Sequence, residues 1–177
     1  MADLQVLQEK WRMWFDSLDV NKSGVLTPKT WTDAADVLIS GHSLEGNDAA
    51  TARAKMGKLG KTVLGDSQSS ITKEQFTQNL TTFFEKDQKQ ALDYITSVLR
   101  SLFEVMDTNN DCMVDEAGFV LMCRAFGHGE DTAKVVFKII SGGQDQIDVD
   151  VCVKFWTDVW FSADNEKWQN ISEALKQ

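Results

Sequence analysis

Apolar residues recur at helical spacing along most of the chain. In the first segment, Leu4, Leu7, Trp11, Trp14, Phe15 and Leu18 follow the i, i+3, i+4, i+7 pattern of a helix with one buried face. The same period predicts helices in the spans 31–39, 49–64, 76–84, 92–106, 119–126, 133–140 and 151–161, and a short ninth helix at 165–175. A single proline in 177 residues agrees with high helical content, because proline is costly inside helices. The pattern therefore predicts an all-α fold.

Four short polar segments separate the members of successive helix pairs, and each contains one embedded aliphatic residue: Leu26, Ile71, Val114 and Ile147. In a twelve-residue EF-hand loop the eighth position forms a small two-stranded bridge to the paired loop, while its neighbours face the cation. Four such positions predict four helix-loop-helix units in two pairs, with loops near 19–30, 64–75, 107–118 and 141–151. We expect a compact single globule with the first pair in residues 1–86, the second in 87–162, and a C-terminal helical tail in 163–177.

The first loop, DVNKSGVLTPKT, has the outline of a calcium site. Calcium loops supply oxygen ligands from positions 1, 3, 5, 7, 9 and 12, with a glycine at position 6 and a bidentate Glu at position 12. The predicted ligands are Asp19, Asn21, Ser23, the Val25 carbonyl and Thr27. Gly24 occupies the turn, but position 12 is Thr30 and only one ligand is charged, so this loop predicts weak attraction for a cation.

The third loop, DTNNDCMVDEAG, has the highest carboxylate count. Its predicted ligands are Asp107, Asn109, Asp111, the Met113 carbonyl and Asp115. Position 6 is Cys112, where the turn needs a positive φ that residues with a β-carbon resist. Position 12 is Gly118, which offers no side chain. Since ligand charge and rigidity set calcium affinity, we expect weak binding at most.

The second and fourth loops predict no cation site. Counting back from Ile71 places Leu64 at position 1, with Asp66 at position 3, Gln68 at position 5 and Gln75 at position 12. The fourth segment begins with two glycines, aligns only if one residue is deleted, and ends at Val151. We interpret both as structural units, so calcium is expected in loops one and three at most, or in none.

The overall charge narrows the choice of partners. The formal net charge is −9, whereas binding of nucleic acids depends mainly on clustered Lys and Arg. Calcium or magnesium ions and basic or amphipathic peptides are the better candidates, and nucleic acid is not expected. Three cysteines without C-x-x-C spacing favour reduced thiols, and no apolar run is long enough for a membrane span. We therefore expect a cytoplasmic protein.

DVNKSGVL and MDTNNDCMVD, together with the paired loops and the glycine-initiated fourth loop, resemble the sarcoplasmic calcium-binding protein family over nearly the whole chain. That wider group includes calexcitin-like proteins, coelenterazine-binding proteins and calcium-triggered photoproteins, all compact four-hand domains. The resemblance implies that hands one and three are the ones most often intact. The sequence departs from the family at each position 12, where Thr30, Gln75, Gly118 and Val151 replace an acid.

Two alternatives to a calcium buffer or sensor remain open. Six tryptophans suit core packing, but they also suit an apolar cavity for a small aromatic ligand. A calcium-independent interaction module is the other alternative, with Met106, Met113, Met122 and Val120 as groove residues. An enzyme is not expected, because the sequence contains no phosphate-binding loop, zinc-protease motif or nucleophile elbow.

Overall fold

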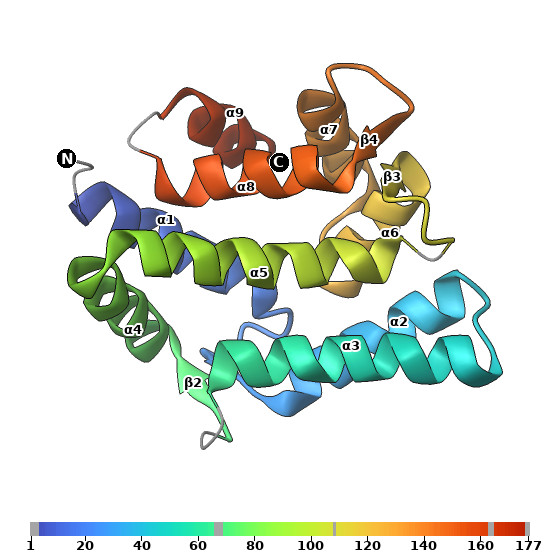
Figure 1. Cartoon of the computed structure of the whole chain (residues 1–177), viewed down its shortest axis with the longest axis horizontal. Helices are drawn as coiled ribbons and strands as arrows, with labels where there is room; N and C mark the ends of the chain where they lie inside the picture. The colour runs from blue at the N-terminus through green and yellow to red at the C-terminus, as the bar shows by residue number, and fades with distance from the viewer. Residues whose placement is uncertain (1–3, 66–68, 108, 163–164, 176–177) are drawn as a thin grey trace.

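The computed structural model describes residues 4–65, 69–107, 109–162 and 165–175. Within these residues the chain forms nine helices (Figure 1). They are α1 (Leu4–Leu18), α2 (Pro28–Gly41), α3 (Gly46–Leu64), α4 (Lys73–Lys86), α5 (Gln88–Met106), α6 (Glu116–Ala125), α7 (Glu130–Ser141), α8 (Val149–Phe161) and α9 (Glu166–Leu175). The all-α architecture expected from the apolar period is confirmed.

Two short antiparallel bridges join the loops in pairs. Strand β1 (Val25–Leu26) pairs with β2 (Ile71–Thr72), and β3 (Met113–Asp115) pairs with β4 (Gln146–Asp148). Leu26 lies opposite Ile71, and Val114 lies opposite Ile147. The four aliphatic residues embedded in the polar segments are therefore the bridge residues, and each is buried. The division into residues 1–86, 87–162 and 163–177 stays a prediction.

Most helices begin a few residues before their apolar pattern does, and in several of them a capping side chain holds the first turn. At α4 the hydroxyl of Thr72 accepts the Gln75 N–H (3.2 Å), and the Gln75 side chain accepts the Thr72 N–H (2.9 Å). At α5 the Asp87 carboxylate accepts the Gln90 N–H (3.0 Å). Such caps satisfy backbone donors that have no partner within the helix. The period of apolar residues does not predict these capping residues.

One hydrophobic core extends through both loop pairs. The largest fully buried side chains include Trp11, Phe15, Trp31, Phe103 and Phe137. Helix α5 crosses the centre of the molecule and packs against α3, α4 and α8 (Figure 1). Because each large apolar side chain contributes roughly 1.5–3 kcal/mol when buried, this shared core is the main source of stability.

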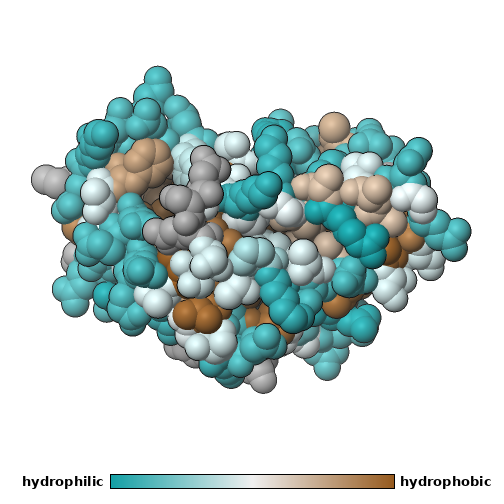
Figure 2. All heavy atoms as spheres, turned by 90° about the horizontal axis from the view of Figure 1, so that it is seen from below, coloured by the Kyte–Doolittle hydropathy of each residue, from teal (hydrophilic) through white to brown (hydrophobic). Residues whose placement is uncertain are grey.

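One face of the molecule is largely polar. Figure 2 shows a face on which hydrophilic residues predominate and apolar areas are small and separated. No described helix combines the length and the hydropathy that a membrane crossing requires.

Candidate cation loops and central cavity

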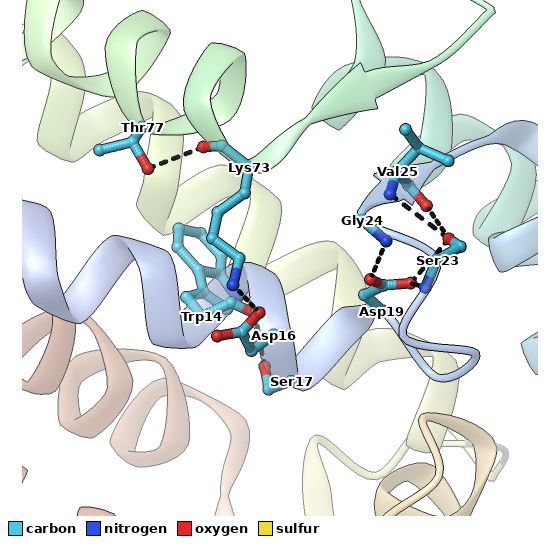
Figure 3. Close-up of polar contacts among 9 residues, drawn as sticks. All are labelled: Trp14, Asp16, Ser17, Asp19, Ser23, Gly24, Val25, Lys73 and Thr77. Carbon is cyan, nitrogen blue, oxygen red and sulfur yellow. Dashed lines mark hydrogen bonds and ion pairs between the residues drawn. The ribbon is translucent and has the colours of Figure 1, made fainter.

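Asp19 organises the first loop, directly after the end of α1 (Figure 3). One carboxylate oxygen, Oδ1, accepts the Ser23 N–H (3.1 Å), and the other, Oδ2, accepts the Gly24 N–H (2.7 Å). Gly24 has φ +78°, the left-handed conformation that glycine adopts without strain. Asp19 is only 6% exposed, so a nearly buried negative charge lies inside the turn.

Three predicted ligand oxygens of this loop converge on one another. The Ser23 hydroxyl oxygen lies 3.0 Å from Asp19 Oδ1 and 2.9 Å from the Val25 carbonyl oxygen. A hydroxyl has one proton, so it cannot satisfy both acceptors fully at the same time. Three oxygens that share one proton form the kind of cluster that a hard cation stabilises.

All five predicted ligands of loop one line a single cavity of about 370 Å³, together with Thr30 at position 12. Cationic groups line it too. Arg124 contributes from α6, and Lys29 forms an ion pair with Asp33 (2.6 Å). Asp19 and Asp33 are the acidic residues in this lining, so the geometry of a calcium loop is present with little net negative charge.

Loop three repeats the arrangement with more carboxylates. Asp107 accepts the N–H groups of Asp111 (3.0 Å) and Cys112 (2.9 Å), one on each carboxylate oxygen. Asp111 accepts the Met113 N–H (2.8 Å), and the Asn109 amide donates to Asp111 (2.8 Å). Asp107, Asn109 and Asp111, the first three predicted ligands, are therefore joined by hydrogen bonds.

Cys112 adopts the positive φ that position 6 requires. Its φ is +61°, and the neighbouring Asn110 has φ +56°. A residue with a β-carbon is strained there by roughly 1–3 kcal/mol. The loop therefore keeps the EF-hand turn at an energetic cost that a glycine would remove. The thiol of Cys112 is exposed.

Asp115 is directed toward the following helix. Its Oδ1 accepts the Gly118 N–H (2.7 Å) and caps α6. A β-carbon at Gly118 would lie 3.1 Å from this same oxygen, so positions 9 and 12 of the loop are neighbours in space. Within the described part of the chain, no three carboxylate, imidazole or thiol side chains are close enough together to hold a metal ion. The residues present thus fit a site that depends on neutral oxygens.

Loops two and four are occupied by structural contacts. Leu64 is buried at the end of α3, and Gln75 takes part in the α4 capping box. Asp66 and Gln68 lie outside the described residues. In the fourth loop Asp148 caps α8 by accepting the Asp150 N–H (2.7 Å), and Val151 is 52% exposed on that helix.

A separate apolar cavity of about 100 Å³ lies between α1, α5, α6, α7 and α8. Stacked indoles form one wall: Trp160 lies 5.7 Å from Trp14 and 5.8 Å from Trp156 between ring centroids. Leu18 and Met106, which directly precede Asp19 and Asp107, also line it. The cavity is therefore adjacent in sequence to the first residue of each candidate cation loop. A second cavity of about 330 Å³ lies on another side of Trp14.

The titratable groups in the cavity wall favour their neutral forms. Burial lowers the pKa of His128 from its ordinary value of 6.5, and a hydrogen bond with the Ser17 carbonyl (3.1 Å) partly opposes that shift. Burial raises the pKa of Cys123 to about 12, which leaves its thiol protonated and unreactive. Outside this wall, burial and the charge of Asp148 raise the pKa of the Cys152 thiol to about 12. The contact of His128 with α1 was not predictable from sequence.

Comparisons with known proteins agree with the four-loop architecture. A sarcoplasmic calcium-binding protein of Mizuhopecten yessoensis is 28% identical over 158 residues, which is 88% of each chain. The chain is thus similar to a sarcoplasmic calcium-binding protein over most of its length. No family model matches the sequence.

Solved structures share the fold of this chain. A coelenterazine-binding protein of Renilla muelleri, in its calcium-loaded apo form, superimposes with a TM-score of 0.81 at 16% identity, covering 98% of this chain and 96% of that one. The sarcoplasmic calcium-binding protein of amphioxus gives a TM-score of 0.64 at 17% identity, with 96% of each chain covered. The EF-hand fold predicted from the loops is thereby confirmed.

Proposed function

We propose that this chain is a cytoplasmic calcium buffer or sensor whose cation sites, loops one and three, are both weak. The observation that carries the proposal is the arrangement of loop one, where five predicted ligands surround one cavity and three of their oxygens converge. Loop three supports it with a hydrogen-bonded set of acids and amide around Asp107. Similarity to a sarcoplasmic calcium-binding protein over most of the chain agrees with both.

Ligand count sets the expected affinity. Neither loop has an acid at position 12, and loop one has a single charged ligand. Sensor sites with full ligand sets bind in the range of about 10⁻⁷–10⁻⁵ M. We therefore expect dissociation constants weaker than about 10⁻⁵ M for both loops, with loop three the tighter because two of its hydrogen-bonded ligands, Asp107 and Asp111, are carboxylates.

Calorimetric titration of the chelator-stripped protein with calcium, and separately with magnesium, tests this proposal. Asp107→Asn should remove the tighter heat signal and Asp19→Asn the weaker one. Asp93→Asn, an exposed acid on α5, is the matched control and should leave both unchanged. Absence of saturable binding below the millimolar range would refute the calcium function.

The apolar cavity favours a second candidate function, in which the fold carries a small uncharged aromatic molecule independently of calcium. Its wall of stacked tryptophans and neutral titratable groups suits such a ligand. The test is titration with N-phenyl-1-naphthylamine in chelator, followed by its fluorescence. Trp156→Leu alters the cavity wall and should weaken binding. Phe155→Leu, at a half-buried neighbour outside the lining, should not. Equal effects of the two variants would refute a cavity site.

A further inference from the structure

Lys10 is a buried lysine that links the two ends of the chain. It lies on α1, and its side chain has no exposed surface. Its ammonium donates a hydrogen bond to the Ser162 carbonyl (2.9 Å), 152 residues away, at the end of α8. The same ammonium lies 5.7 Å from the centroid of the Trp168 ring on α9. The ammonium of this α1 residue thus contacts both the C-terminal end of α8 and a ring of α9.

The C-terminal end of α8 is a favourable place for the Lys10 cation. The last carbonyls of a helix have no partner within it and carry the negative end of the helix dipole, which attracts Lys side chains. The neighbouring residue adds to the contact, because the Trp11 indole N–H donates to the Trp160 carbonyl (3.2 Å). Helix α1 therefore caps the C-terminal end of α8 with two consecutive side chains.

Helix α9 is docked at the same place. Trp168 packs against Trp160 with ring centroids 5.5 Å apart, and Lys167 forms an ion pair with Asp158 (2.8 Å). Further along, Ile171 is fully buried and Ala174 is 5% exposed. The main helix neighbours of α9 are α7 and α8 (Figure 1). A ten-residue helix is too short to persist alone in water, so its order depends on this docking.

We propose that α9 is a separately opening unit of the fold and that Lys10 is the residue that holds it closed. A buried ammonium is tolerated only while hydrogen-bonding and aromatic partners compensate for its lost hydration. The Ser162 carbonyl and the Trp168 ring are such partners, and both lie at the junction of α8 and α9. Detachment of α9 takes the ring away from the ammonium, while the core formed by α1 to α8 keeps its own packing.

Native-state amide hydrogen exchange of the full chain distinguishes a separate opening of α9, controlled by Lys10, from a general contribution of Lys10 to stability. Lys10→Met keeps the length of the side chain and removes the charge. It should lower the protection of α9 amides at least about tenfold and change α5 amides by less than about threefold. Lys58→Met, at an exposed lysine of α3, is the matched control and should preserve α9 protection. An equal loss in α5 and α9, or unchanged protection of α9, would overturn the proposal.

The wild-type protein provides a second measurement should Lys10→Met not fold. In low concentrations of urea, amides of α9 should exchange through an opening with a weaker urea dependence than that of α5 amides, because less surface is exposed. Identical urea dependence for the two helices would mean that α9 opens only with the whole domain, which contradicts a separate unit.

Discussion

Gly57 and Gly60 lie almost one turn apart on α3 but have different surroundings. A β-carbon at Gly60 would lie 2.3 Å from Cδ1 of the buried Trp31 ring, whereas one at Gly57 would have nothing within 4 Å. We expect Gly60→Ala to destabilise the fold by about 1–3 kcal/mol through overpacking. Gly57→Ala should stabilise it by up to about 1 kcal/mol, because alanine favours the helix. Urea unfolding of both variants measures the difference, and equal effects would contradict the tight packing at Gly60.

Two residues of loop three determine its weakness. Gly118→Glu adds the missing acid at position 12, and Cys112→Gly removes the strain of a positive φ. The double variant should bind calcium at least about tenfold more tightly, because charge and preorganisation both increase. A variant with Gln at position 118 in the same Cys112→Gly background has the same size without the charge and should show a smaller gain. Unchanged calorimetric affinity in the Glu variant would refute the assigned register of loop three.

His128 predicts a pH dependence of stability. Burial lowers its pKa in the folded state, so the unfolded chain takes up the proton at a higher pH. Unfolding therefore binds a proton, and stability is full above the ordinary pKa of 6.5 and decreases as the pH falls through that value toward the folded pKa. In His128→Asn the free energy of unfolding, measured in urea, should depend less on pH between about pH 7 and pH 5. His42 is present in both proteins. The same slope in the variant would assign the effect to other groups.

At the scale of elements, Asp115 has two roles that can be separated. It caps α6 through the Gly118 N–H, and it is a predicted ligand of loop three. Asp115→Asn keeps a good capping side chain but loses the charge, so stability should hold while calcium affinity falls. Asp115→Ala should lower both, with a loss of about 1 kcal/mol in stability. Thermal unfolding in chelator together with calorimetry separates the two effects. An unchanged affinity in both variants would exclude Asp115 as a ligand.

The elements themselves were predictable from sequence to different degrees. The apolar period predicted the helices, and single aliphatic residues such as Leu26 and Val114 predicted the bridges, because both reflect which side chains must be buried. Helix beginnings were less accurate, since they depend on caps such as Asp87. Lys10 and His128 could not be predicted: their contacts join residues more than 100 positions apart, and their types alone suggest surface positions.

The candidate site was also predictable from sequence only in part. Spacing alone placed Asp19 and Asp107 at the first position of their loops, and in the structure each carboxylate accepts the backbone N–H groups of loop positions 5 and 6. The capping role of Asp115 and the approach of Arg124 to loop one depend on how neighbouring helices pack. A ligand count along the chain therefore overstates the charge available to a cation in loop one.

At the scale of the whole molecule, the fold should form without calcium. Its core joins both loop pairs through α5 and consists of packed aromatic and aliphatic side chains that need no ion. In loops one and three, backbone N–H groups already compensate the two nearly buried carboxylates, Asp19 and Asp107. Far-UV circular dichroism in excess chelator should therefore show a helical protein that unfolds cooperatively on heating.

Calcium should add only a small increment to this stability. A ligand that binds the folded state alone stabilises it by RT ln(1 + [L]/Kd), which is about 1.4 kcal/mol when free calcium is ten times Kd. Weak loops thus predict a modest rise in the unfolding temperature at millimolar calcium, and Asp19→Asn combined with Asp107→Asn should abolish that rise. A random-coil spectrum in chelator that becomes helical on adding calcium would contradict this account, because folding energy would then come from the ion and not from the core.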